Sequence, residues 1–158
     1  MLHIVKKIHN LLIKKKEAIA VAESCTGGLL SQLLTELPRS SQYFILGLVL
    51  YSNSAKENIL KIPASILKKR GAVSENIARL MAKSVRLLAK ADFGIGVTGI
   101  AGPAGDAKEK PVGTVFIAID SKNKKICRKF RFTGNRTNIR RKSALKTLEL
   151  LKKLLINR

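Results

Sequence analysis

Residues Ser24-Cys25-Thr26-Gly27-Gly28 combine two hydroxyls, a thiol and two glycines in one short segment. An apolar run ending at Ala22 precedes them and an apolar segment over residues 29–37 follows, which predicts a strand-to-helix turn. N–H groups at a helix N-terminus favour negative charge. The turn is therefore a candidate for holding a nucleophile and an anion. Taken alone, the segment is more typical of a serine or threonine that caps the helix and of glycines that make the turn than of catalysis.

A serine nucleophile in this chain needs a base other than histidine. The two histidines, His3 and His9, lie six residues apart on different sides of an expected helix, which argues against a Ser-His-Asp triad, a Cys-His dyad or a histidine-rich metal site. Tyr51 and Lys56 follow an apolar strand, and a desolvated lysine is a known substitute base. As isolated residues they also fit packing and surface charge. Cys25 is the rival nucleophile, with no histidine to activate it.

Gly94, Gly96 and Gly99 have the spacing of the dinucleotide-binding motif G-x-G-x-x-G, with Asp120 at a suitable distance. That motif requires the glycines to follow a strand and open a helix. Here they lie inside an expected strand, and the proline and glycines that follow cannot begin a helix. We therefore reject a dinucleotide site; glycines in such a strand admit a close backbone or ligand.

The segment Thr98-Gly99-Ile100-Ala101-Gly102-Pro103 follows that strand. Its small residues leave N–H groups free to form an anion-binding nest. By itself, the segment is equally compatible with an ordinary flexible connection.

Apolar periodicity predicts alternating helices and strands, and hence an α/β domain of three α/β/α layers around a mixed sheet. The run over 44–51 is typical of a central strand, 126–132 alternates like an edge strand, and the turn at 120–125 predicts an antiparallel hairpin. Helices are expected around residues 4–12, 29–37 and 77–88 and at the C-terminus, where apolar periodicity covers 144–155 and Arg136 and Arg140 lie at the helix start. Further strands end at Ala22 or cover 93–98 and 112–119.

Length and composition favour one compact domain over residues 1–158, because 46% of the residues are hydrophobic. Cys25 and Cys127 form no disulfide or zinc pattern, which favours a reducing compartment and a cytoplasmic location. Lysines interrupt the apolar residues at the N-terminus, so no targeting or membrane-spanning segment is expected.

The formal net charge of +21 is extreme. Lysine and arginine are spread along almost every expected element, and with no tryptophan and 4% aromatic residues the chain lacks a stacking platform for single strands. This pattern predicts non-specific affinity for polyanions and makes a dedicated nucleic-acid role the minority interpretation.

Seven blocks, in order and along almost the whole chain, resemble the CinA C-terminal domain family. They are Ala22-Glu23-Ser24-Cys25-Thr26-Gly27-Gly28, Ser40-Ser41-x-Tyr43-Phe44, Tyr51-Ser52-Asn53-x-Ala55-Lys56, Gly71-Ala72-Val73-Ser74-Glu75, Val97-Thr98-Gly99-Ile100-Ala101-Gly102-Pro103, Lys110-Pro111-Val112-Gly113-Thr114-Val115 and Gly134-Asn135-Arg136. Any one block is a weak signal, but seven together are specific.

The resemblance implies an amidohydrolase that converts nicotinamide mononucleotide to nicotinic acid mononucleotide and ammonia in pyridine-nucleotide recycling. It also implies the stand-alone form of the family, without the domain related to molybdopterin-binding proteins, and a homodimer. No cofactor or metal is expected, because hydrolysis of a carboxamide through a serine ester needs none and the sequence shows no ligand set. The alternative is a non-catalytic module that binds nucleotide or nucleic acid, linked to competence and DNA damage.

Under this resemblance Ser24 attacks the carboxamide and forms an acyl-enzyme, with Lys56 or Tyr51 as the base; the sequence leaves that choice open. The N–H groups of Thr26, Gly27 and Gly28 are expected to hold the oxyanion. The other residues implied in substrate binding are Asn53, Thr98, Gly99, Ala101 and Gly102 in the pocket, and Arg136 and Arg140 on the 5′-phosphate.

Two departures from the family pattern stand out. The glycine-rich loop reads Pro103-Ala104-Gly105-Asp106, where relatives tend to have more glycine. Arg39 replaces a usual glycine, and we expect it to add a cation near the mouth of the site.

Overall fold

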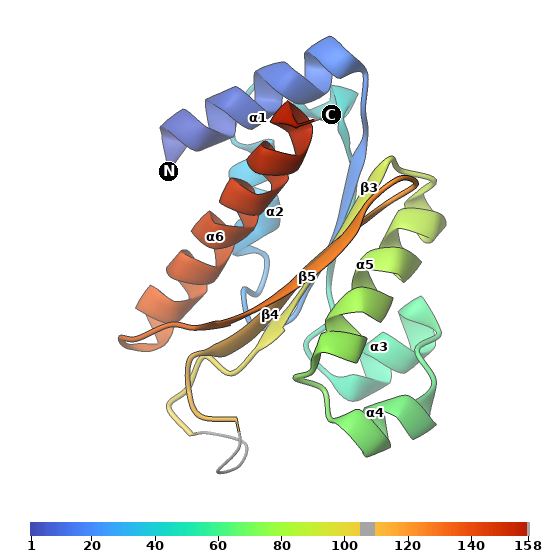
Figure 1. Cartoon of the computed structure of the whole chain (residues 1–158), viewed down its shortest axis with the longest axis vertical. Coiled ribbons are helices and arrows are strands. Elements are labelled where there is room, and N and C mark those ends of the chain that lie inside the picture. The colour runs from blue at the N-terminus through green and yellow to red at the C-terminus, as the bar shows by residue number, and fades with distance from the viewer. Residues whose placement is uncertain (105–109, 158) are drawn as a thin grey trace.

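The computed structural model describes residues 1–104 and 110–157. A five-stranded sheet lies between two layers of helices (Figure 1), which confirms the expected α/β class. The strand order is β2-β1-β3-β4-β5; β1 is parallel to β2 and β3, and β4 is antiparallel to β3 and β5. The strands are β1 (Ile19–Glu23), β2 (Phe44–Val49), β3 (Phe93–Gly99), β4 (Thr114–Ser121) and β5 (Lys125–Arg131).

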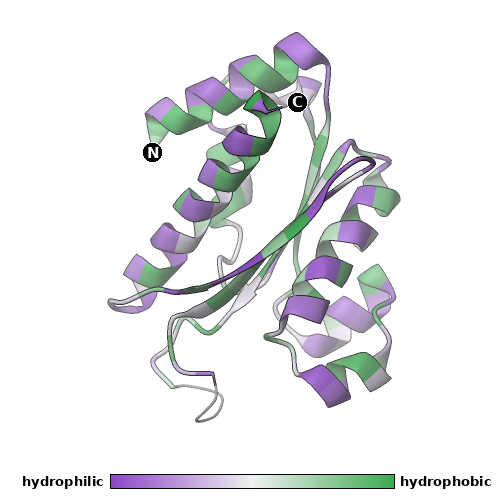
Figure 2. Ribbon diagram, viewed as in Figure 1, coloured by the Kyte–Doolittle hydropathy of each residue, from purple (hydrophilic) through white to green (hydrophobic). Residues whose placement is uncertain are grey.

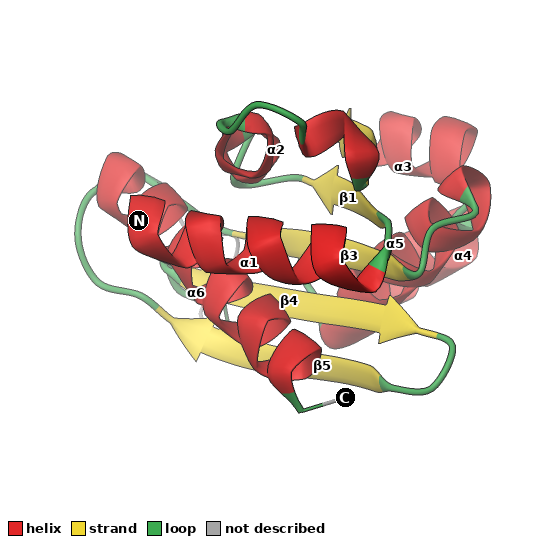
Figure 3. Ribbon diagram, turned by 90° about the horizontal axis from the view of Figure 1, so that it is seen from above, coloured by secondary structure: helices red, strands yellow, loops and turns green. Residues whose placement is uncertain are grey.

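Each face of the sheet is covered by its own set of helices. One layer consists of α1 (Leu2–Lys15), α2 (Leu29–Thr35) and α6 (Arg136–Ile156), and the other of α3 (Asn53–Leu60), α4 (Ala64–Arg70) and α5 (Glu75–Ala89) (Figure 3). A 3₁₀ turn, η1 (Ser40–Gln42), leads into β2. Polar and apolar residues alternate along α1 and α6 (Figure 2), as expected for helices with one buried face. None of the described helices is both long and apolar enough to cross a bilayer.

The strands lie within two residues of their expected positions, and the hairpin β4-β5 is confirmed. The final helix begins at Arg136, as expected, although its apolar periodicity is clear only from Ala144 onwards. Two expectations are wrong. Helices α3 and α4 are not predicted at all, being only eight and seven residues long. Strand β2 is an edge strand, not a central one, and its residues alternate between partial burial and exposure.

The glycines that mimic a dinucleotide motif lie within β3, as expected. A Cβ atom on Gly94 would lie 2.0 Å from the carbonyl oxygen of Ala82, and one on Gly96 would lie 2.3 Å from that of Ala78. Both carbonyls belong to α5. The glycines therefore admit the backbone of α5 at close range, and Asp120 is engaged in an ion pair with Arg86, 2.6 Å away.

Candidate active site

A cleft opens at the carboxyl ends of the three parallel strands. The chain leaves β1 for β2 on one side and returns to β3 on the other, and this reversal of strand order is where α/β proteins place ligands. The cavity measures about 270 Å³. Its lining comes from the segments after β1, β2 and β3 and from the start of α6: Ser24, Cys25, Tyr51, Asn53, Lys56, Ala72, Val73, Thr98, Gly99, Ile100, Ala101, Gly102, Ala104 and Arg136.

Ser24 and Lys56 meet at the base of this cleft. Ser24 is the first residue after β1, and its N–H donates to the carbonyl of Val97 on β3 at 2.9 Å, which fixes the serine between the two strands. Lys56 lies on α3, whose N-terminus is capped by the Ser52 hydroxyl. The Nζ atom of Lys56 lies 3.4 Å from Oγ of Ser24. The two residues come from separate segments that only the fold brings together.

Lys56 is 1% exposed, and its burial lowers the pKa of the ammonium below its usual value. Its Nζ also donates to the carbonyls of Leu50 at 2.9 Å and Ser52 at 3.4 Å. A neutral amine has two N–H bonds and one lone pair. The two carbonyls can accept both hydrogens, which leaves the lone pair for the Ser24 hydroxyl. This arrangement suits a lysine that acts as a base.

The rival nucleophile Cys25 is unsuited to attack. The thiol is buried, and the loss of solvation raises its pKa to about 12. The thiolate is the nucleophilic form of cysteine, and it is scarce at neutral pH when the pKa is this high.

Tyr51 and Arg136 lie at the outer rim of the cleft. Tyr51 is 59% exposed, and its hydroxyl accepts a hydrogen bond from the Arg136 guanidinium. The same guanidinium donates to the carbonyl of Gly102 at 2.6 Å. Tyr51 is thus bonded to a cation at the rim, whereas Lys56 is bonded to Ser24.

The turn after Ser24 is organised by Glu23, a residue that the sequence reading did not single out. Its carboxylate is fully buried and accepts hydrogen bonds from the N–H groups of Gly28, Leu30 and Ser31 and from the Ser31 hydroxyl, at 2.6–3.1 Å. It thereby caps α2. An acidic residue at the end of an apolar run, just before a turn into a helix, was the available signal.

This cap changes the expected anion site. The N–H of Gly27 donates to the Ser24 carbonyl at 3.1 Å and that of Gly28 donates to Glu23, so neither is free for an oxyanion in this conformation. Thr26, Gly27 and Gly28 are also absent from the cleft lining. The expectation that these two glycine N–H groups face the substrate is therefore not met.

Arg140 is placed differently from its expected role. Its guanidinium donates twice to the Thr26 carbonyl, at 2.9 and 3.2 Å, and lies against Gly27. It clamps the turn from the side of α6 and does not line the cleft. Of the two arginines expected on the phosphate, the structure brings only Arg136 to the cleft.

The remaining expected residues, Asn53, Thr98, Gly99, Ala101 and Gly102, all line the cleft. The Thr98 hydroxyl donates to the Ala72 carbonyl at 2.8 Å, which links the end of β3 to the segment before α5. Ala72 and Val73, not expected as site residues, complete this wall. Gly105 and Asp106 lie outside the described residues.

Arg39 does not lie near the cleft as expected. It precedes β2, whereas the cleft lies beyond the far end of that strand. Six residues of strand separate the two positions by roughly 20 Å. Its φ of 70° lies in the left-handed region, which explains why glycine suits this position.

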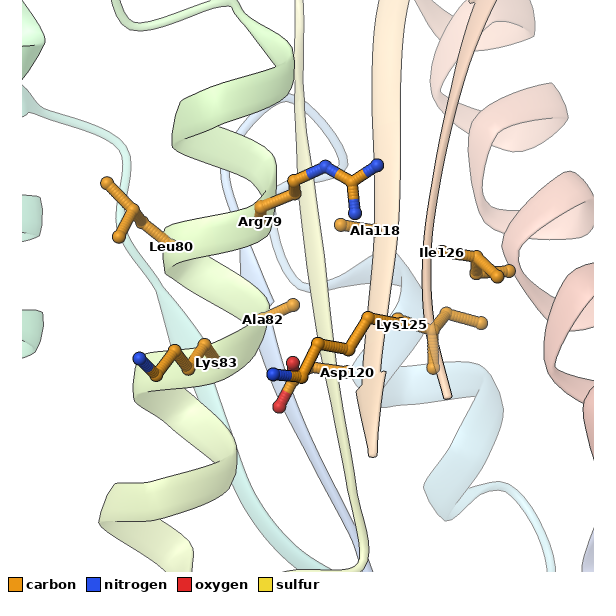
Figure 4. A pocket seen from close by; sticks show the side chains of 9 residues that line it. Arg79, Leu80, Ala82, Lys83, Ala118, Asp120, Lys125 and Ile126 are labelled. Atoms are coloured by element: carbon orange, nitrogen blue, oxygen red, sulfur yellow. The ribbon is translucent and has the colours of Figure 1, made fainter. Parts of the chain in front are cut away.

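A second pocket lies between α5 and the β4-β5 hairpin (Figure 4). Its volume is about 120 Å³ and its walls are mainly apolar, with Arg79, Lys83 and Lys125 around it. Asp120 at its edge is paired with Arg86. The pocket offers neither a nucleophile nor an unpaired acid, so we place the chemistry in the larger cleft.

The fold and the cleft together define an α/β protein with a serine and a buried lysine at the carboxyl ends of its parallel strands. The chain belongs to the CinA C-terminal domain family, whose model matches residues 2–155.

Relatives in sequence include a CinA-like protein of Thermotoga maritima, 47% identical over 148 residues, and one of Geobacter sulfurreducens, 42% identical over 149 residues. Each match covers 94% of this chain and 36% of the relative, so this chain spans about a third of these proteins' length.

Solved structures of proteins from this family have the same fold. A CinA superfamily protein from Klebsiella pneumoniae has a TM-score of 0.95 and 29% identity, covering 99% of this chain and 98% of that one. The competence/damage inducible protein CihA from Agrobacterium tumefaciens has a TM-score of 0.94 and 36% identity, covering 97% and 94%.

Proposed function

We propose that this protein hydrolyses the carboxamide of nicotinamide mononucleotide to nicotinic acid mononucleotide and ammonia, through an acyl-enzyme on Ser24. The observation that carries this proposal is the contact between Ser24 and the fully buried Lys56, 3.4 Å apart in the cleft. A non-catalytic binding module has no use for a desolvated base beside a hydroxyl. The substrate itself comes from the family resemblance.

In the first step, neutral Lys56 takes the hydroxyl proton as Ser24 Oγ bonds to the carboxamide carbon. The tetrahedral intermediate then collapses, the carbon–nitrogen bond breaks, and Lys56 returns the proton to the departing nitrogen, which leaves as ammonia. Water attacks the resulting ester, again with Lys56 as the base, and releases the carboxylic acid and free Ser24.

Two other parts of the cleft receive roles in this proposal. Ala101 and Gly102 line the cleft, and no acceptor for their N–H groups is found among the described residues, so we assign them to the oxyanion. The Arg136 guanidinium uses two of its five N–H groups on Gly102 and Tyr51, which leaves donors for a phosphate.

The test is ammonia release from nicotinamide mononucleotide by the purified protein and by Ser24→Ala. We expect the variant to lose turnover while it keeps its fold and binds the substrate. Cys25→Ala is the matched control and should retain activity. Turnover by Ser24→Ala equal to that of the unmodified protein would exclude the serine mechanism.

A further inference from the structure

The cleft contains a buried lysine but no acidic side chain among its described lining residues. None of the ion pairs formed by the described part of the chain involves Lys56. Glu23, the acid next to Ser24 in the chain, uses its carboxylate on N–H groups at the start of α2. The ammonium form of Lys56 therefore has no carboxylate partner among the described residues.

The protonation state of Lys56 decides what the Ser24 hydroxyl can do. The ammonium has three N–H groups, and Nζ has three acceptors within reach, the carbonyls of Leu50 and Ser52 and Oγ of Ser24. With all three N–H groups used in this way, Ser24 Oγ accepts from the lysine and its own hydrogen needs another acceptor. The described residues offer none, so this hydrogen is available to a ligand in the cleft.

This arrangement of donors fits a carboxylate better than a carboxamide. Besides the Ser24 O–H, the cleft presents the N–H groups of Ala101 and Gly102, which have no acceptor among the described residues. A carboxylate has two accepting oxygens, one for the hydroxyl and one for the N–H groups. A carboxamide in the same place has a single oxygen, so the Ser24 hydrogen meets an NH₂ group that cannot accept it.

We propose that the cleft with protonated Lys56 is a binding site for carboxylate anions, through which the acidic product of the reaction inhibits this protein. The identity of that product, nicotinic acid mononucleotide, rests on the proposed function. Hydrolysis of the Ser24 ester forms a carboxylic acid beside neutral Lys56, and a carboxyl group gives up its proton at much lower pH than an amine. The proton passes through the Ser24 hydroxyl to Nζ, which leaves a carboxylate and an ammonium. Each turnover thus ends with the product paired to a cation that lacks another partner.

Lys56 is the group in the cleft whose protonation can respond to a bound carboxylate. The other charged or titratable groups around it are Glu23, Cys25, Tyr51, Arg136 and Arg140. Glu23 and Arg140 are bonded to the turn after Ser24, and Tyr51 and Arg136 are bonded to each other at the rim. Burial raises the pKa of Cys25 to about 12, which keeps this thiol neutral. The walls from β3 and from the segment before α5 carry no charged side chain.

Isothermal titration calorimetry with nicotinic acid mononucleotide tests this inference on the unmodified protein. Titrations in buffers of different ionisation enthalpy count the protons taken up on binding. Below the lowered pKa of Lys56 we expect no uptake, because the lysine is already charged. Above this pKa, uptake should approach about one proton per molecule bound, and the dissociation constant should rise about tenfold per pH unit.

A matched ligand and two variants serve as controls. The pyridinium mononucleotide without the carboxyl group keeps the ring charge, ribose and phosphate, and should bind without this proton uptake. Lys56→Met should lose the uptake with nicotinic acid mononucleotide. Arg136→Met also removes a cation from the cleft, and it should bind more weakly but keep the uptake. Circular dichroism verifies that both variants are folded.

Several results would overturn the inference. They are no binding of nicotinic acid mononucleotide, binding without proton uptake at every pH, uptake with the control ligand too, and uptake that persists in Lys56→Met. Calorimetry needs no turnover, so the two proposals can fail separately. Proton-linked binding without ammonia release would contradict the amidase proposal and leave the carboxylate site standing. Ammonia release without proton-linked binding would contradict this inference alone.

Discussion

At the scale of single residues, the lysine in the cleft makes the activity depend on pH in a defined direction. Burial lowers the pKa of Lys56 from its usual value of 10.5, and in the proposed mechanism the neutral amine is the base, so turnover should rise with pH through this lowered pKa. Lys56→Met should lose activity by ~10²-fold or more and lose this rise. Lys56→Arg, which keeps the charge but cannot give up its proton, should be equally inactive. A retained pH rise in Lys56→Met would transfer the role to another group.

The same residue links protonation to stability. Between the lowered pKa of folded Lys56 and 10.5, the unfolded chain binds more protons than the folded one, so the free energy of unfolding rises with pH across this window. Below the window, the lysine is charged in both states and the folded protein bears the full desolvation cost. Urea unfolding of the unmodified protein and of Lys56→Met across this pH range should show the rise only in the former.

Arg136 and Arg140 have separable roles. Arg136 lines the cleft, so Arg136→Met should raise the KM for nicotinamide mononucleotide and hardly affect the dephosphorylated riboside. Arg140 holds the Thr26 carbonyl two residues from Ser24, the proposed nucleophile, so Arg140→Met should lower kcat on both substrates to the same degree. Steady-state kinetics with the two substrates distinguish these outcomes. Equal impairment of Arg136→Met on both would mean that Arg136 does not bind the phosphate.

At the scale of elements, Gly94 and Gly96 of β3 allow the backbone of α5 to pack close to this strand. A Cβ atom at Gly96 would lie 2.3 Å from the Ala78 carbonyl, a distance that forces the helix and strand apart. Gly96→Ala should therefore lower the free energy of unfolding by about 1–3 kcal/mol or more, as overpacking of a core does. Chemical denaturation measures the loss. An unchanged midpoint would contradict the close approach of α5.

At the scale of the whole molecule, the dispersed positive charge predicts a property separate from catalysis. The chain should bind duplex DNA without sequence preference, with an affinity that falls steeply as salt increases. Exchanging Lys14, Lys68 and Lys152 for glutamine should reduce the slope of the log–log salt plot by up to about 3. We expect the amidase activity to be unchanged in this triple variant. Sequence-specific binding with a shallow salt slope would instead support a dedicated nucleic-acid role.

Much of the fold was predictable, because long amphipathic helices and apolar strands leave periodic signals. Strand β2 resembles a central strand in sequence, because exposed Ile45 and Val49 alternate with partly buried Leu46 and Leu48 and all four residues are apolar. The side chains of Ile45 and Val49 are apolar although 51% and 49% of their surface is exposed. Apolar residue type alone therefore does not distinguish an exposed face of a strand from a buried one.

The sequence predicted which residues form the site better than it predicted the role of each residue. Ser24, Tyr51 and Lys56 could be proposed from residue type, but the choice of Lys56 as the base depends on its burial, which comes from the unpredicted helix α3. The turn was misjudged because a side chain, Glu23, occupies the N–H groups that an isolated helix start would offer. Both the burial of Lys56 and the loss of free N–H groups at the turn result from contacts in the folded chain, which the sequence pattern does not show.

The buried thiol beside the nucleophile has a consequence for how the protein responds to oxidants. Peroxides and electrophilic alkylating agents react with thiolates, and Cys25, with a pKa raised to about 12 and little exposed surface, offers almost none. A serine hydroxyl is inert to the same reagents. A hydrolase that uses Ser24 as proposed would therefore keep working under oxidative stress that disables cysteine-dependent hydrolases, even though Cys25 is the next residue in the chain.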